Sequence, residues 1–201
     1  WKRRAASAPR WRRLKRLKYQ TAFLSFLAAA QLLTAIPVPF ASSIGSKHQR
    51  WAAAWLPLIG LGLGGLALGV DLLLKPVLPV GPRSALVLLT IAVATRFLHM
   101  DGLMDTFDGA FAMAQRARRL EIMRDPHVGA FGVGAGVLAV LVKFSILAAV
   151  PDTGRSAILL LTPTVGRWAA VQAIAIWPNA REAGLGVQYA GGNRTAILAA
   201  S

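Results

Sequence analysis

Apolar residues along the chain gather in long runs that are separated by short polar segments. The runs approach the roughly 20 residues that a helix needs to cross a bilayer, and in lipid the backbone groups must be hydrogen-bonded within the segment itself. A very apolar soluble core is the alternative, which the length of the runs disfavours. The pattern therefore predicts transmembrane helices over 51–74, 84–100, 130–150 and 156–178, with 195–201 opening another.

The apolar segment 21–40 is ambiguous, because it is long enough to span but carries Gln31 and ends in Pro-Val-Pro, which cannot continue a helix. The distribution of basic residues decides the matter. If 21–40 does not cross, the basic N-terminal arm and the loops 41–50, 101–129 and 179–194 share one side, and the other side holds only Lys75, Arg83 and Arg155. The positive-inside rule then places the basic set in the cytoplasm. We therefore predict a re-entrant or interfacial N-terminal segment and a cytoplasmic acidic loop.

The composition supports a membrane protein. Hydrophobic residues make up 55% of the 201 residues and charged residues 15%, against roughly 25% charged residues in soluble domains. We expect an all-α fold, a polytopic integral membrane helical bundle, with a basic arm over 1–19 and a single transmembrane domain over 20–201. Because the chain has no cysteine, thiolate nucleophiles and cysteine-based metal sites are excluded.

The net charge of +15 is concentrated at the N-terminus, since nine of the 23 Lys and Arg residues lie in the first 18 positions. Basic residues interleaved with Trp and Leu beside an apolar segment are typical of binding to an anionic lipid surface. No nucleic-acid recognition module follows the arm, so we expect the lipid bilayer and not nucleic acid as its partner.

The acidic residues are concentrated elsewhere, and five of the eight lie between 101 and 125. If 99–111 is helical, Asp101, Asp105 and Asp108 fall within an arc of about 60°. Carboxylates this close repel one another unless a cation neutralises them, and oxygen ligands without thiolates select a hard cation such as Mg²⁺. The alternative is a solvated acidic helix start, which the helix dipole favours. We predict a Mg²⁺ site at Asp101, Asp105 and Asp108.

Several neighbours of the acids are candidates for substrate binding or proton transfer. Arg124 has the chemistry to bind a phosphate, or to pair with Glu121 three residues earlier. His99 and His127 are candidate bases near neutral pH or hydrogen-bonding spacers. Gly132 and Gly136 form a G-x-x-x-G pair, which predicts a close helix-packing seam.

Two cations lie inside apolar runs, Lys143 and Arg167. Such residues either extend to the bilayer surface or face a polar cavity, and for Lys143, which is deep in its run, we expect a cavity that accepts phosphate. Arg181, in the loop 179–194, either completes the rim of the site or belongs to a solvated turn.

These residues together resemble a known family. The string HMDGLMDTFDG, followed by EIMRDPHVGAFG, is similar to the cobalamin synthase family of adenosylcobinamide-GDP ribazoletransferases. Further similarities are TAIPVPF, WLPLIGLGLGGL, GRWAA and REAGLG, so that the resemblance covers roughly 20–192.

The resemblance implies a Mg²⁺-dependent phosphotransferase of the inner membrane. It joins adenosylcobinamide-GDP to α-ribazole, or its 5′-phosphate, and releases GMP. By position, Asp101, Asp105, Asp108 and Asp125 would be the metal and catalytic carboxylates, with His99, Arg124 and His127 beside them. The family also carries a later acidic segment of the G-D-T-L-G-A type, so we expect that the protein continues beyond Ser201 or that the site is incomplete. The sequence is compatible with a homo-oligomer.

Two other functions compete with this one. CDP-alcohol phosphotransferases also hold Mg²⁺ on span-end aspartates, but their pattern has D-G-x-x-A-R where this chain has Asp105 after DGLM. A cation transporter or channel expects acids within the spans, whereas Lys143 and Arg167 at those depths would repel cations.

Overall fold

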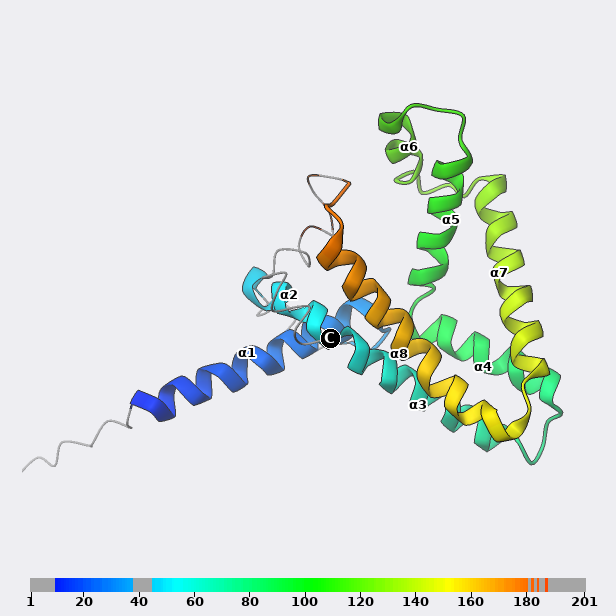
Figure 1. Cartoon of the computed structure of the whole chain (residues 1–201), viewed down its shortest axis with the longest axis horizontal. Coiled ribbons are helices and arrows are strands. Elements are labelled where there is room, and N and C mark those ends of the chain that lie inside the picture. The colour runs from blue at the N-terminus through cyan, green and yellow to red at the C-terminus, as the bar shows by residue number, and fades with distance from the viewer. Residues whose placement is uncertain (1–9, 38–44, 181, 183, 185–186, 188–201) are drawn as a thin grey trace, which may run out of the picture. The chain divides into compact units, whose positions relative to one another are not determined.

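The computed structural model describes residues 10–37, 45–180, 182, 184 and 187. Within this part every regular element is a helix, as expected for an all-α fold. The elements in chain order are α1 (Arg10–Leu33), α2 (Ser46–Ala52), the 3₁₀ helix η2 (Ala53–Trp55), α3 (Leu56–Leu74), α4 (Val80–Ala94), α5 (Leu98–Phe111), α6 (Arg116–Ile122), α7 (Ala130–Ala149) and α8 (Asp152–Ile176) (Figure 1).

Several of these helices are long and apolar enough to cross a membrane. Three pass on length and composition: Ala53–Leu74, Ala130–Ala149 and Asp152–Ile176. A fourth span is added if the bent pair α4 and α5 counts as one. The apolar part of α1, Tyr19–Leu33, is shorter than these. The described residues of this membrane protein thus contain three or four candidate spans, and the further span expected to open over 195–201 lies outside them. The re-entrant or interfacial position of the first segment stays a prediction.

The continuous helix expected over 84–100 is wrong. The chain forms α4 and α5 instead, which meet at an angle of 85°. Arg96 and Phe97 at the junction have φ angles of 52° and 56°, in the left-handed region that residues with a Cβ rarely adopt. Neither Pro nor Gly marks this break, so the periodicity of the sequence could not indicate it.

By its contacts the chain divides into two compact units, and the division into a basic arm and one domain stays a prediction. One unit contains Gly60–Thr164 with Leu33–Ala35, and the other contains the described parts of the rest. In the second unit Phe26 of α1 and Trp55 of η2 form an edge-to-face ring pair with centroids 5.7 Å apart.

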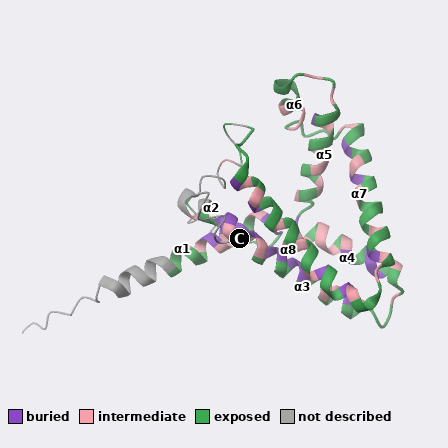
Figure 2. Ribbon diagram, in the orientation of Figure 1, coloured by how far each residue is buried: buried purple, intermediate pink, exposed green. Residues whose placement is uncertain are grey.

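The Gly60–Thr164 unit holds the candidate chemistry. Its core is built from α3, α4, α7 and α8, which contribute Ala67, Val87, Leu147 and Leu159. Helices α5 and α7 lie side by side (Figure 1). Much of α7 is coloured as exposed in Figure 2. Its exposed side chains include Val137, Leu138 and Leu141. Apolar side chains on a span of this kind are suited to lipid.

Candidate functional site

The three aspartates of the motif lie on one helix, as the spacing predicted. α5 carries Asp101 in its first turn, where the helix dipole favours negative charge. Asp101 is exposed, while Asp105 and Asp108 are half-buried. The Asp101 carboxylate makes no hydrogen bond or ion pair with any described residue, whereas Asp105 has an interaction partner. Of the three, Asp101 is thus the most available to an external ligand.

Asp108 has a different environment, because both of its carboxylate oxygens accept hydrogen bonds from the start of α7. The backbone N–H of Gly129 donates to Oδ2 at 2.7 Å, and that of Gly132 donates to Oδ1 at 2.8 Å. We call this arrangement of Asp108, Gly129 and Gly132 the interhelical cap. It links α5 to α7 at the base of the acidic loop.

The seam between α5 and α7 is as close as the G-x-x-x-G pair predicted. A Cβ atom on Gly132 would lie 2.8 Å from the carbonyl oxygen of Met104, and one on Gly136 would lie 3.1 Å from the Met104 sulfur. Both glycines are buried. On the helical wheel of α5 the strip of Met100 and Met104 adjoins the aspartates, so the packing against α7 leaves Asp101 and Asp105 to one side of the seam.

The loop after α6 places Asp125 beside His127. The backbone N–H of His127 donates to Asp125 Oδ1 at 2.9 Å, and its Nδ1 lies 2.7 Å from the same oxygen. The backbone hydrogen bond first, and then the bond to the ring, hold the pKa of Asp125 below its ordinary value. Asp125 is therefore an ionised carboxylate at neutral pH with an imidazole next to it.

Arg124 does not form the ion pair with Glu121 that the sequence allowed. Glu121 instead pairs with Arg118, whose Nη1 lies 2.9 Å from Oε2. The exposed Arg124 side chain makes no hydrogen bond or ion pair with a described residue. Its guanidinium therefore keeps all its donors for an anion.

The other predicted cations and histidines fall in separate places. His99 is exposed on the first turn of α5, and Lys143 is exposed on α7, about 16 Å along the helix from Gly132 at 1.5 Å per residue. Arg167 is half-buried on α8 in the other unit, and Arg181 lies outside the described residues. The structure thus brings Asp108 against α7 and Asp125 against His127, but does not join all the predicted residues into one cluster.

No group of three or more His, Asp or Glu side chains within the described ranges is arranged to hold a metal ion. Mg²⁺ does not require such a group, because it is commonly bound by one or two carboxylates plus water and substrate phosphates. Asp101 and Asp105, one turn apart, have the donor chemistry for such a site. The residues present therefore fit Mg²⁺ as a partner shared with a phosphorylated substrate.

A second charged cluster, which the sequence reasoning missed, lies at the far end of α7. Arg155 Nε donates to Asp71 Oδ1 at 2.8 Å, and Arg155 Nη2 donates to Ser84 Oγ at 2.9 Å. Arg155 Nη1 donates to the Leu147 carbonyl. Arg83 Nε lies 3.2 Å from the same Asp71 oxygen, close enough for an ion pair. These three charged residues, Asp71, Arg83 and Arg155, form the buried charge cluster and are each at most 3% exposed.

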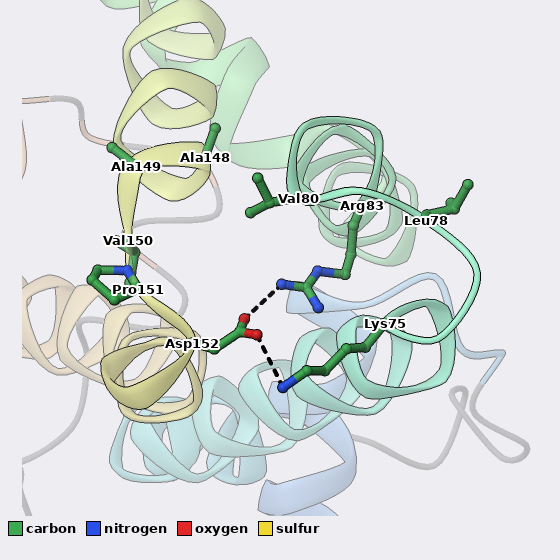
Figure 3. A pocket seen from close by; sticks show the side chains of 9 residues that line it. All are labelled: Lys75, Leu78, Val80, Arg83, Ala148, Ala149, Val150, Pro151 and Asp152. Atoms are coloured by element: carbon green, nitrogen blue, oxygen red, sulfur yellow. Dashed lines mark hydrogen bonds and ion pairs between the residues drawn. The ribbon is translucent and has the colours of Figure 1, made fainter.

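The buried charge cluster is bordered by a shallow cavity of about 450 Å³, shown in Figure 3. Asp152 lies at its centre and pairs with Arg83 at 2.7 Å and with Lys75 at 3.0 Å. Ala148, Val150 and Pro151 line its apolar wall. The signal available in the sequence was Asp71, an acid inside a predicted span, together with arginines at two other span ends, since charges at such depths require partners.

Comparisons with known proteins agree with the motif. The family model described as Cobalamin-5-phosphate synthase matches residues 25–201. Proteins named adenosylcobinamide-GDP ribazoletransferase are similar: that of Geotalea daltonii is 39% identical over 83% of this chain and 67% of its own length. That of Desulfitobacterium hafniense is 37% identical over 79% of this chain and 63% of its length. That of Roseiflexus sp. is 35% identical, over 79% and 59%. The chain spans about three fifths to two thirds of such relatives. No solved structure matches.

Proposed function

The chain belongs to the Cobalamin-5-phosphate synthase family, and from this premise we propose that the protein is a membrane phosphotransferase of cobalamin biosynthesis. Its substrates are adenosylcobinamide-GDP and α-ribazole, or α-ribazole 5′-phosphate. A ribose hydroxyl oxygen of the acceptor bonds to the corrinoid-linked phosphorus, the bond from that phosphorus to the oxygen of GMP breaks, and the hydroxyl proton passes to a base. The observation that carries this proposal is the aspartate face of α5 (Asp101, Asp105 and Asp108) within the matched region.

The chemistry of this transfer is mainly positioning and neutralisation of charge. When bound, Mg²⁺ supplies positive charge for the diphosphate oxygens. Asp101 and Asp105 are the carboxylates that would hold it, because they lie one turn apart on α5 and Asp101 is exposed. Arg124 binds non-bridging oxygens with its unpaired guanidinium. Asp125, which stays ionised beside His127, accepts the proton from the attacking hydroxyl.

More distant cations are assigned to the remainder of the substrates. Lys143 and Arg167 lie within candidate spans, where a charge is normally functional. We assign them, with His99 and Arg181, to binding and orienting the two substrates.

We further propose that the site faces the cytoplasm at the inner membrane, where guanine nucleotides are present. The support is the arrangement of basic loops, which the positive-inside rule places in the cytoplasm. A reporter fused within 114–119 of the full-length protein should be cytoplasmic. A periplasmic reporter would overturn this orientation.

The buried Asp71 of α3 does not support the rival function as a cation transporter. Asp71 is the acid that such a path would use at membrane depth, but Arg155 and Arg83 neutralise it. A CDP-alcohol phosphotransferase is disfavoured by the match of 25–201 to a different family.

The test is an assay of the purified full-length protein in detergent or liposomes. With adenosylcobinamide-GDP, α-ribazole and Mg²⁺, we expect stoichiometric formation of a corrinoid nucleotide and GMP, and no GMP when either the acceptor or Mg²⁺ is omitted. GMP release without a joined corrinoid product, or no reaction of a folded protein, would contradict the proposal.

A further inference from the structure

Asp108 is the member of the aspartate face whose surroundings do not resemble a metal ligand. We infer that Asp108 is a positioning residue that fixes the start of α7 to α5, and that it is not a ligand of the Mg²⁺ ion. The inference rests on the proposed function for its catalytic consequence, but the contact itself is a property of the fold. Its basis is the interhelical cap described above.

The cap satisfies two particular backbone groups. Gly129 is the N-cap residue of α7, and Gly132 is the third residue of the helix. The N–H groups at these two positions have no partner inside a helix. In many helices they are satisfied by side chains of the same two positions, which bond reciprocally to one another's backbone N–H. Here both positions are glycine, and the side chain of Asp108, from another helix, replaces both.

The two glycines are required for this arrangement by space as well as by chemistry. A Cβ atom built on Gly129 or on Gly132 would collide with the Asp108 carboxylate. Gly134 of the same helix has no such role, since a Cβ built there meets nothing within 4 Å. The two glycines of the segment G-A-F-G at 129–132 thus leave room for the Asp108 carboxylate and donate hydrogen bonds to it. Gly129 lies twenty-one residues after Asp108 in the sequence.

The cap also limits what Asp108 can do for a metal ion. Each oxygen already accepts one N–H, and the positive end of the α7 dipole lies against the carboxylate. Asp101, by contrast, makes no such bond with a described residue. The same carboxylate chemistry therefore serves two purposes on α5, ligand binding at Asp101 and Asp105 and helix docking at Asp108.

The attachment of α7 to α5 through Asp108 determines the positions of the Asp101 and Asp105 carboxylates. At the other end of α5, the left-handed residues Arg96 and Phe97 fix the angle to α4. With both ends fixed, α5 presents Asp101 and Asp105 at a defined place beside α7. Loss of the cap should therefore lower kcat through misplacement of these groups, without removing a metal ligand.

The experiment compares Asp108→Asn, Gly132→Ala and the control Gly134→Ala in the full-length protein in native membranes. The contact between α5 and α7 is measured by oxidative cross-linking of a Met104→Cys, Gly136→Cys pair placed in every variant. This pair is suitable because Met104 Cγ lies 3.3 Å from a Cβ built at 136. We expect Asp108→Asn and Gly132→Ala to slow cross-linking by about tenfold, and Gly134→Ala to leave it unchanged.

Kinetics without the cysteine pair then separate docking from metal binding. We expect Asp108→Asn and Gly132→Ala to lower kcat by a similar factor, about tenfold or more, with the Mg²⁺ concentration for half-maximal activity unchanged within twofold. Their combination should lower kcat no further than either alone. An increase of about tenfold in that Mg²⁺ concentration for Asp108→Asn but not for Gly132→Ala would show a ligand and overturn the inference. So would cross-linking at the wild-type rate in both variants.

These outcomes are distinct from a failure of the proposed function. If the wild-type protein releases no GMP, the phosphotransferase assignment fails while the cross-linking result still decides whether Asp108 docks the two helices.

Discussion

The two ends of α7 meet charged residues of opposite character. In the loop before its start, Arg124 and Asp125 are exposed to solvent, and Asp101 is exposed on the neighbouring α5. At its far end, about 27 Å along the helix from Gly129 to Leu147 at 1.5 Å per residue, the residues of the buried charge cluster pair with one another and with Asp152. The charges at the far end are buried and paired, whereas Asp101 and Arg124 are exposed and make no side-chain hydrogen bond or ion pair with a described residue.

The difference follows from the cost of desolvation. A buried arginine or aspartate without a partner is destabilising by several kcal/mol, so the cluster at the far end exists only because Asp71, Arg83 and Arg155 are close together. Exposed acids avoid this desolvation cost, so their oxygens are accessible to a cation. Asp108 belongs to the acidic end by sequence but resembles the far end in its bonding, since its oxygens are engaged by the protein.

The largest effect is expected from breaking the buried charge cluster. Asp71→Ala leaves the buried Arg155 without its carboxylate and Arg83 with Asp152 as its one remaining carboxylate partner among the described residues. It should destabilise the protein by about 3–5 kcal/mol, measured by thermal unfolding in detergent. Asp152→Ala is the matched control at the same end, because its side chain is half exposed and its loss should be far milder. Equal stability of the two variants would contradict the structural role of the cluster.

Substitution of Asp101 or Asp105, the acidic end of the comparison, should lower activity and leave stability unchanged. Asp101→Ala and Asp105→Ala should each lower Mg²⁺-dependent GMP release by about 100-fold or more, as for the loss of other transition-state contacts. Membrane insertion and unfolding temperature should stay at wild-type values, measured on the same preparations. Near wild-type turnover in either variant would remove that aspartate from the catalytic set.

Two neighbouring glycines of α3, one in close contact with α8 and one not, allow the same comparison of buried and open positions for uncharged residues. A Cβ on Gly64 would lie 2.7 Å from the Leu160 carbonyl oxygen, whereas one on Gly65 meets nothing within 4 Å. Gly64→Ala should therefore destabilise by about 1–3 kcal/mol through overpacking, and Gly65→Ala should be neutral or slightly stabilising. The same detergent melting assay distinguishes them, and indistinguishable melting curves would argue against a close seam.

The smallest effect is expected at the surface of the acidic loop. Arg124→Ala should raise the KM for adenosylcobinamide-GDP by about tenfold, because a charge-assisted phosphate contact is lost. Arg118→Ala removes only an exposed ion pair with Glu121 and should change KM and stability little. The reverse order of effects would assign the phosphate contact to Arg118.

The sequence predicted much of this arrangement. The span expected over 130–150 is Ala130–Ala149, and that over 156–178 overlaps Asp152–Ile176, because long apolar runs directly report the bilayer's thickness. The helical register of the aspartates and the Gly132–Gly136 seam followed from periodicity. The break at Arg96 and Phe97 could not be predicted, because tertiary packing there overrides the local preference of non-glycine residues.

Contacts between residues far apart in the sequence also could not be predicted. Asp71 and Arg155 are 84 residues apart and Asp108 and Gly129 are 21 apart, and no local pattern relates such positions. The three aspartates looked equivalent on a helical wheel, and only the position of α7 distinguishes Asp108 from the other two. Which charges are exposed to ligand and which are engaged by the protein depends on the fold.

The most direct test of this division is metal binding itself. Mn²⁺ is a paramagnetic substitute for Mg²⁺, and its binding to the full-length protein with adenosylcobinamide-GDP is measured by electron paramagnetic resonance for wild type, Asp101→Asn and Asp152→Asn. We expect about tenfold or greater loss of Mn²⁺ affinity in Asp101→Asn and wild-type affinity in Asp152→Asn. Unchanged affinity in Asp101→Asn, or a matching loss in Asp152→Asn, would contradict the assignment of the metal to the acidic end.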